Sequence, residues 1–297
     1  MEKLTRRQFS NLVIAGVAGV PAAFRASQDA KGTVAGVQLG AQSYSFRDLS
    51  LDDAIAGYVK AGLGFCELWQ SHVEPREARG EDRAKRRESL RAWRLSVPLD
   101  DFTKIRQKFT DAGVQLTAYN LSFVDDFTDA EIRRGFEMAR ALGVKVITAS
   151  STLSVVPRLA PVAKEFGIAV GLHNHSEIKP NEFATPDDFA AATKGMPDLI
   201  AINLDIGHFT AANFDALDYL DKHHDRIVSL HIKDRRRDQG PYVPFGEGDA
   251  PIVAVLQRLR DRKWAIPAQI EYEYRGAGTV DEVKRCADYC RAALNKA

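Results

Sequence analysis

The sequence predicts an α/β protein with the (β/α)8 fold known as the TIM barrel. Eight short apolar runs follow residue 35, and amphipathic segments of helical period separate them. Four of these helical segments end in a glycine that leads directly into the next apolar run, at Gly62, Gly113, Gly143 and Gly167. Glycine just past a helix is the expected stop signal, because it adopts the left-handed conformation without penalty. Eight such units in one chain of 297 residues favour a closed barrel over an open sheet.

The barrel is expected to occupy residues 35–297, and its elements can be placed in chain order. We expect strands at residues 36–43, 64–69, 114–119, 144–149, 168–173, 200–205, 227–232 and 267–272. We expect helices at residues 51–62, 100–112, 129–142, 153–166, 186–195, 213–223, 250–262 and 279–294. The charged segment Glu74–Arg94 interrupts this order after the second strand. We interpret it as a solvated helix or loop on the rim rather than a polyanion site, and it could also form part of a lid.

Potential metal ligands follow four strands in the second half of the chain. Only seven histidines are present, and four of them lie at or just past the end of an apolar run. In (β/α)8 barrels the chemistry takes place at the carboxyl ends of the strands, where all these residues fall. Imidazole and carboxylate together suit a divalent ion such as Mn, Zn, Co or Fe. The sequence therefore predicts a metal enzyme. The candidates are His173, His175, Glu177, Asp205, His208, His231, Lys233, Glu271 and Glu273.

Composition and charge narrow the class of protein. Hydrophobic residues make up 45% of the chain and charged residues 27%, as in a globular protein with a large core. The formal net charge of +1 provides no field that would attract nucleic acid or an anionic membrane. Cys66, Cys286 and Cys290 have no zinc-site spacing, and we expect free thiols.

The first 30 residues are predicted to be an export signal. Thr5-Arg6-Arg7-Gln8-Phe9 resembles the twin-arginine signal, which carries folded proteins across the bacterial inner membrane. The apolar stretch Leu12–Val20 is far shorter than the roughly 20 residues of a spanning helix, so no stable membrane anchor is expected after the signal is removed. A periplasmic or secreted protein follows, and the alternative is a cytoplasmic protein with a basic tail. Ala23 and Ala26 are both candidate cleavage points.

Four motifs carry a resemblance to a known family. They are Asn203–His208 (NLDIGH), Leu230–Asp234 (LHIKD), Gly246–Asp249 (GEGD) and Gln269–Glu271 (QIE). In this order and spacing they resemble the sugar phosphate isomerase/epimerase family of xylose isomerase-like TIM barrels, over roughly residues 36–295. The resemblance implies one divalent metal ion, whose identity stays open, and a small-molecule sugar or cyclitol as the substrate. Barrels of this family often dimerise, so the resemblance also allows a homodimer.

The resemblance implies a ligand set with one departure. Asp205, His231 and Glu271 match three of the four metal ligands of the family's epimerases. His173 stands where the family usually has a glutamate, and it is expected as the fourth ligand. In the resembling epimerases both glutamates act as acid/base groups on opposite faces of the substrate. An imidazole in place of one of them leaves room for a lyase or hydratase.

Catalytic and substrate-binding roles follow from the same reading. Glu271 is the expected base, His173 is a ligand or the second acid/base group, and His208 is expected to point toward the substrate. Lys233 could bind substrate oxygens together with Asp234, or the two could form a rim ion pair. The Gly246–Asp249 loop could close on substrate. The expected substrate contacts are Glu67, His175, Lys233, Tyr44 and Trp69.

Two of these contacts have an alternative interpretation. Glu67 lies inside the barrel and needs a partner there, either a sugar hydroxyl or Arg47. Tyr44 and Trp69 could form a platform for a sugar face or could pack in the core.

The functional hypothesis is a divalent-metal-dependent isomerase or epimerase. It would remove a proton next to the carbonyl of a keto-sugar or cyclitol, a step that a bound metal assists as a Lewis acid. The alternative is a metal-dependent lyase or hydratase acting on 3-keto sugars or inososes. A non-catalytic carbohydrate-binding barrel is a further alternative. The net charge and the export signal argue against a nuclease resembling endonuclease IV, so we expect no nucleic-acid partner.

Overall fold

Eight parallel strands close into a barrel in the computed structural model, which describes residues 32–75 and 82–296. The strands are β2 (Val37–Gln42), β3 (Phe65–Trp69), β4 (Gln115–Asn120), β5 (Val146–Ala149), β6 (Ala169–His173), β7 (Ile200–Asp205), β8 (Ile227–Ile232) and β9 (Ala268–Ile270). Each pairs with its neighbour in the chain, and β9 pairs with β2, with Gln269 opposite Gly40, so that the ring closes. All eight predicted strands and the predicted (β/α)8 fold are confirmed. A short strand that was not predicted, β1 (Thr33–Val34), pairs antiparallel with β2.

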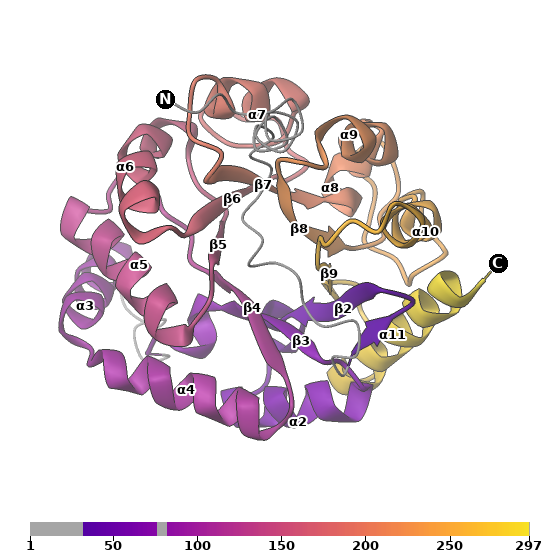
Figure 1. Cartoon of the computed structure of the whole chain (residues 1–297), viewed down its shortest axis with the longest axis horizontal. Helices are drawn as coiled ribbons and strands as arrows, with labels where there is room; N and C mark the ends of the chain where they lie inside the picture. Colours follow the sequence, from indigo (N-terminus) through magenta and orange to yellow (C-terminus); the bar gives the residue numbers. More distant parts are fainter. Residues whose placement is uncertain (1–31, 76–81, 297) are drawn as a thin grey trace, which may run out of the picture.

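Helices form an outer ring around the barrel (Figure 1). They are α2 (Leu51–Ala61), α3 (Arg83–Ser96), α4 (Leu99–Asp111), α5 (Asp129–Leu142), α6 (Val156–Phe166), α7 (Pro186–Thr193), α8 (Ile206–Ala211), α9 (Ala216–His223), α10 (Ile252–Arg262) and α11 (Thr279–Asn295). The predicted glycine stops are present: Gly62 and Gly143 cap α2 and α5 with φ angles of 69° and 77°. In the parts of the chain that the structure describes, no helix is both long and apolar enough to cross a membrane.

In the charged segment after β3, the part from Arg83 onward belongs to helix α3, on the rim. It is held by ion pairs rather than lying free in solvent. Arg94 Nε lies 2.8 Å from Glu74 Oε1, and both side chains are buried. Arg87 and Arg91 lie 3.0 Å and 2.9 Å from the buried Glu131 carboxylate at the start of α5. These contacts fix α3 against the barrel.

Polar side chains occupy the barrel interior, and apolar ones fill the shell between the strands and the helices. Because successive side chains of a strand point to opposite faces, Leu204 and Leu230 belong to the main apolar core, while their neighbours Asn203 and His231 face inward. A small separate apolar cluster lies near the amino-terminal ends of the strands and consists of Ala118, Val146 and Ala169. The carboxyl ends are left for polar groups. The proposed export signal, residues 1–30, lies outside the described residues.

Candidate functional site

Four side chains converge at the carboxyl ends of adjacent strands. His173 ends β6, Asp205 ends β7, His231 is the fifth residue of β8, and Glu271 follows β9 directly. The parallel register places Asp205 opposite His231 and His173 opposite Asn203. All four are buried, and one ligand atom from each lies within 4.8 Å of the others. The sequence-predicted ligand set is therefore brought together by the fold.

This cluster fits a divalent metal ion. Two imidazoles and two carboxylates are the donor set that Zn, Mn, Co or Fe accepts. Asp205 Oδ2 is buried and accepts no directed hydrogen bond, although the Lys233 ammonium lies 3.0 Å from it, so this oxygen already faces a cation. Burial raises the pKa of Asp205 to about 6, although the Lys233 ammonium opposes this shift. The carboxylate is thus poorly solvated and suited to direct binding of an ion.

Glu67 lies beneath the cluster and is fully buried on β3. Its Oε1 accepts a hydrogen bond from Thr148 Oγ1 (2.6 Å) and lies 2.9 Å from His231 Nε2, while Ser229 Oγ donates to Oε2 (3.2 Å). Arg47, one of the two partners suggested for Glu67, has other acceptors. It follows the 3-10 turn η2 (Ser43–Phe46) and donates to the main-chain oxygen of Tyr272 at 2.8 Å.

His231 is held between two carboxylates. Its Nδ1 lies 3.0 Å from Glu271 Oε2, on the side of the cluster, and its Nε2 faces Glu67. Burial disfavours the charged ring, but Glu67 and Glu271 outweigh it and raise the pKa of His231 to about 10. This arrangement leaves Nδ1 for a metal ion and Nε2–H for Glu67, as in sites where a carboxylate orients a metal-binding imidazole.

Lys233 occupies the centre of the acidic group. Its Nζ lies 3.0 Å from Asp205 Oδ2, 2.8 Å from Glu271 Oε2 and 2.6 Å from Glu273 Oε2, and only 2% of the residue is exposed. The alternative prediction, a rim ion pair between Lys233 and Asp234, is wrong. Since His231 and Lys233 share the inward face, the next side chain turns away.

Asp234 organises the loop after β8 instead. Its carboxylate accepts main-chain N–H bonds from Gly246 (2.8 Å), Gly248 (3.0 Å) and Ala250 (3.3 Å). These bonds give the Gly246–Asp249 loop a fixed conformation in this structure. Asp234 is therefore occupied by the main chain and is not oriented toward a substrate.

His208 lies in the site beside two cations. Its Nε2 is 3.0 Å from Lys233 Nζ, and its Nδ1 is 3.0 Å from Arg235 Nη1. Burial, followed by the Lys233 charge, holds the pKa of His208 well below its usual range. The ring is neutral near pH 7, and the Tyr242 ring lies 6.0 Å from it. His175 is exposed, with its ring 5.2 Å from that of His173.

Tyr44 and Trp69 lie side by side at the ends of β2 and β3. Their ring centroids are 5.0 Å apart in an edge-to-face arrangement, and both are partly exposed. Burial, followed by the Glu273 carboxylate, raises the pKa of Tyr44. The position suits contact with a substrate, so the platform stays a prediction.

Sequence reasoning missed three participants. Asn203 Nδ2 lies 3.1 Å from His231 Nε2, and its Oδ1 is buried without a hydrogen bond. Asn203 lies two residues before Asp205 on one strand, so the two side chains face the same side, and this spacing could have identified Asn203. Arg235 and Tyr242 reach the site from the loop after β8, where they form an isolated antiparallel bridge that no sequence periodicity marks.

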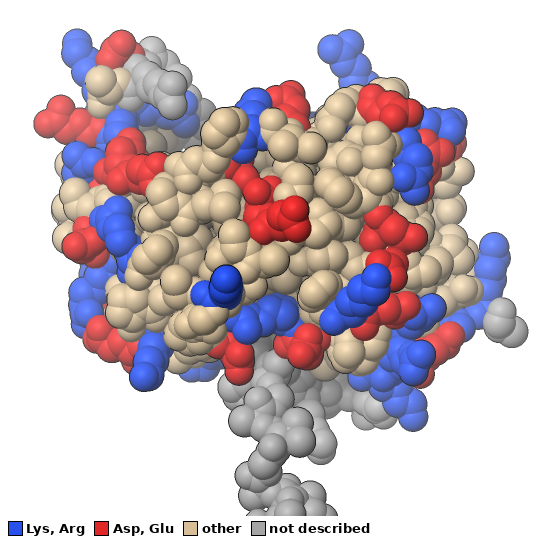
Figure 2. Space-filling model, turned by 90° about the horizontal axis from the view of Figure 1, so that it is seen from above, with Lys and Arg blue, Asp and Glu red and all other residues tan. Residues whose placement is uncertain are grey.

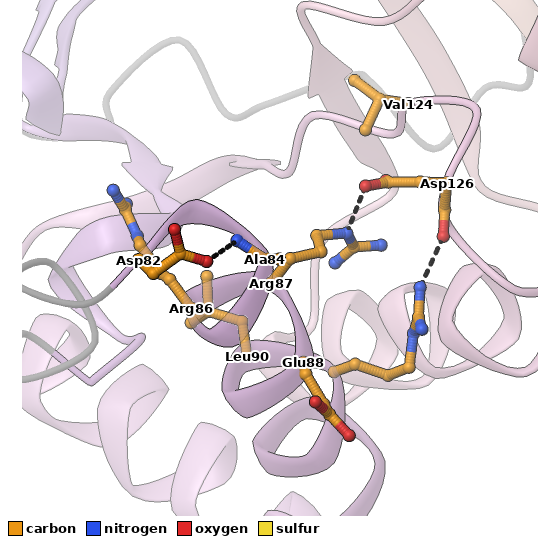
Figure 3. A pocket seen from close by; sticks show the side chains of 9 residues that line it. Asp82, Ala84, Arg86, Arg87, Glu88, Leu90, Val124 and Asp126 are labelled. Atoms are coloured by element: carbon orange, nitrogen blue, oxygen red, sulfur yellow. Dashed lines mark hydrogen bonds and ion pairs between the residues drawn. The ribbon is translucent and has the colours of Figure 1, made fainter.

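A separate pocket of about 990 Å³ lies between α3 and the loop that joins β4 to α5 (Figure 3). Its lining carries both charges, and Arg87 Nε is 2.8 Å from Asp126 Oδ2 across it. None of its lining residues belongs to the metal-ligand cluster. On the face of the molecule shown in Figure 2, basic and acidic side chains are interspersed, unlike the basic face of a nucleic-acid-binding protein.

Comparisons with known proteins agree with this fold. A family model described as xylose isomerase-like TIM barrel matches residues 59–292. The IolI protein with a bound zinc atom is 17% identical, with a TM-score of 0.64 over 87% of this chain and 98% of that chain. A sugar phosphate isomerase/epimerase from Parabacteroides distasonis is 18% identical, with a TM-score of 0.60 over 86% of this chain and 94% of that chain.

A third similar solved structure is named as a dehydratase rather than an isomerase or epimerase. The probable 3-DHS dehydratase AsbF from Bacillus anthracis is 16% identical, with a TM-score of 0.60 over 85% of this chain and 98% of that chain. At these identities the likeness concerns the fold. A comparison with curated protein sequences gives no match.

Proposed function

Because the chain belongs to the xylose isomerase-like TIM barrel family, we propose that it is a metal-dependent sugar isomerase or epimerase. It would act on a keto-sugar or cyclitol by removing a proton from a carbon next to the carbonyl. The observation that carries this proposal is the convergence of His173, Asp205, His231 and Glu271 within 4.8 Å at the carboxyl ends of the strands. Neighbours named as sugar isomerases or epimerases support the same class.

Those four residues would hold the ion. When bound, a divalent ion would polarise the carbonyl and neighbouring hydroxyl of the substrate as a Lewis acid. Glu67 would keep the Nε2 proton of His231 in place, so that Nδ1 stays directed at the ion. Because Glu67 is fully buried, we assign it this positioning role in place of the expected contact with substrate.

Glu271 is the proposed base. Although burial favours the neutral acid, Lys233 and His231 hold the pKa of Glu271 well below its usual range, so the carboxylate is ionised and able to accept a proton. The same contacts make it a weak base. The assignment therefore requires the Lys233 contact to be loosened before Glu271 accepts the proton.

The substrate would approach from the open end of the barrel. His208 and Lys233 provide polar groups there, and His175 is exposed at the mouth. Tyr44 and Trp69 border the same end and could contact a sugar face. We propose these five residues as the substrate-binding group.

A lyase is the second candidate function. Burial and the nearby His231 hold the pKa of His173 well below its usual range, so this position carries a neutral imidazole rather than a second carboxylate. That change favours β-elimination or hydration of a 3-keto sugar or inosose over simple epimerisation. A structural neighbour named as a dehydratase is consistent with it.

Export through the twin-arginine pathway is also proposed, for residues 1–30. Unphosphorylated sugars, oxidised glycosides or inososes suit an extracytoplasmic enzyme. Replacing Arg6 and Arg7 with lysine should hold the protein in the cytoplasm, as measured by cell fractionation. Equal periplasmic amounts of both versions would remove this part of the proposal. The homodimer can be tested by sedimentation of the mature protein.

Proton NMR in D2O tests the activity. Metal-loaded protein is incubated with ketohexoses, inososes and 3-keto-glucosides. An isomerase or epimerase should introduce deuterium at a carbon beside the carbonyl, whereas a lyase should release water or the aglycone. Glu271→Gln should abolish the reaction, while Glu165→Gln, at an exposed glutamate on α6, serves as the matched control. Full activity of Glu271→Gln would reject the base assignment, and no reaction across the panel with metal bound would reject both enzyme classes for these substrates.

A further inference from the structure

We propose that the Lys233 ammonium is a built-in competitor of the metal ion, which holds the carboxylates of Asp205 and Glu271 in its absence and withdraws when an ion binds. This inference rests on the proposed function, because it assumes that these two carboxylates are metal ligands. It concerns the affinity of the site for an ion rather than the reaction. Nothing in it requires Lys233 to lose its proton.

Lys233 and a bound metal ion would contact the same carboxylate oxygens. Lys233 Nζ lies 3.0 Å from Asp205 Oδ2 and 2.8 Å from Glu271 Oε2. Glu271 Oε2 also faces His231 Nδ1, so it points into the ligand cluster. A divalent ion binds carboxylate oxygens at about 2.0–2.2 Å. An ion on these oxygens would therefore lie a few ångströms from a like-charged ammonium in a buried site, where repulsion is poorly screened.

Two of the contacts that Lys233 makes lack the geometry of a hydrogen bond. Asp205 Oδ2 and Glu273 Oε2 are buried but accept no hydrogen bond, although Lys233 Nζ lies 3.0 Å and 2.6 Å from them. The ammonium therefore meets these oxygens as a neighbouring charge, without the angles of a directed hydrogen bond. Such contacts neutralise the carboxylates but leave their lone pairs open to a cation with shorter, directed bonds.

The Lys233 ammonium can move away from the candidate ligands toward the mouth of the barrel. The side-chain exposure increases from Asp205 (0%) through Glu271 (8%) to Glu273 (16%), so Glu273 lies nearest to the mouth. Lys233 already contacts Glu273 at 2.6 Å, and a rotation of the ammonium about this contact would keep one ion pair while releasing the other two. The Tyr242 ring lies 5.5 Å from Nζ and can stay in contact with the cation.

The stem of Lys233, in contrast, is fixed by close packing. A Cβ atom at Gly207 would lie 2.9 Å from both Cβ and Cγ of Lys233, and 2.7 Å from its main-chain oxygen. Only glycine at the start of α8 leaves room for this stem. The stem is therefore held in the site, and a rotation of the outer carbons suffices to move the charge.

The test is the affinity of purified protein for Zn²⁺ and Mn²⁺, measured by competition with a metal-binding dye. Lys233→Met removes the ammonium and should bind both ions at least tenfold more tightly than the wild type. Lys233→Gln keeps a polar side chain without the charge, and it should also bind both ions more tightly than the wild type. It serves as a second variant if Lys233→Met does not fold. Lys233→Arg keeps the charge and should not bind more tightly. Lys222→Met removes an exposed lysine and is the matched control.

Thermal unfolding gives a second measurement. Zn²⁺ should raise the melting temperature of Lys233→Met by more than it raises that of the wild type. Equal or weaker binding by both charge-removing variants, with metal bound by the wild type, would overturn this inference and leave the proposed metal enzyme intact. Absence of binding by the wild type and all variants would overturn both.

Discussion

His231 Nε2 lies 2.9 Å from Glu67 Oε1, and both side chains are completely buried inside the barrel. This contact ties the second strand of the barrel to the seventh, directly under the residues that would bind a metal ion. A buried carboxylate on one ring nitrogen fixes the orientation and protonation of the ring, so the other nitrogen is available to a metal. The same contact therefore holds two strands of the barrel together and orients a candidate metal ligand.

Glu67→Gln should weaken metal binding. The amide keeps the size of the side chain but removes the charge that stabilises the Nε2 proton of His231, and such changes typically cost roughly 10- to 100-fold in affinity. The dissociation constant for Zn²⁺ is the quantity to measure. Glu247→Gln makes the same substitution in an exposed loop and should leave it unchanged. Unaltered affinity in Glu67→Gln would show that this carboxylate does not support the site.

The stability of the metal-free protein should fall as the pH rises from about 7 to about 10. Glu67 and Glu271 raise the pKa of His231 from 6.5 to about 10 despite its burial. A raised folded-state pKa contributes stability that is fully present below 6.5 and is lost as the pH passes through the folded value. Denaturant unfolding at several pH values in the presence of chelator measures this.

His231→Gln is the matching variant for the pH series. It cannot carry the proton, so its free energy of unfolding should be lower at pH 7 and should change less between pH 7 and pH 10. If the free energy of unfolding falls as steeply between pH 7 and pH 10 in His231→Gln as in the wild type, groups other than His231 cause the decline.

Glu131→Gln should destabilise the fold without touching the site. Its carboxylate receives Arg87 and Arg91 and also forms the capping box of α5 with Thr128. The neutral amide no longer balances these arginines, whose side chains are partly exposed (19% and 35%), so the loss should be about 1–3 kcal/mol. Glu165→Gln breaks an exposed pair with Arg133 and should cost about 0–1 kcal/mol. Equal losses in the two variants would contradict the anchoring of α3 through Glu131.

The barrel could be predicted because its signals are local and repeated. A glycine such as Gly143 ends its helix at a φ angle of 77°, and an apolar run follows at once. The short helix α8 was missed because all six of its residues are buried, so that no polar face marks it. Asp205 caps the start of this helix, because its side chain accepts the N–H of His208 at 2.7 Å. That cap depends on tertiary burial as much as on sequence.

The convergence of the candidate ligands could also be predicted, but their hydrogen-bond and ion-pair partners could not. The ends of parallel strands meet at one edge, and this placed Asp205, His231 and Glu271 together in advance. Nearness in sequence suggested Asp234 as the partner of Lys233, whereas the fold supplies Glu273 from β9's end, 2.6 Å away. Such partners depend on the register between strands that are distant in the sequence, which no local pattern encodes.

The most direct measurement is anomalous diffraction from crystals of the protein loaded with Zn²⁺ or Mn²⁺, recorded at the absorption edge of the metal. We predict one strong peak per chain, bounded by His173, Asp205, His231 and Glu271, and its loss in Asp205→Asn. Asp215→Asn, which changes an exposed helix cap, should keep the peak. A wild-type crystal without a peak at these four residues, or with a peak only elsewhere, would contradict the metal site on which the proposed function depends.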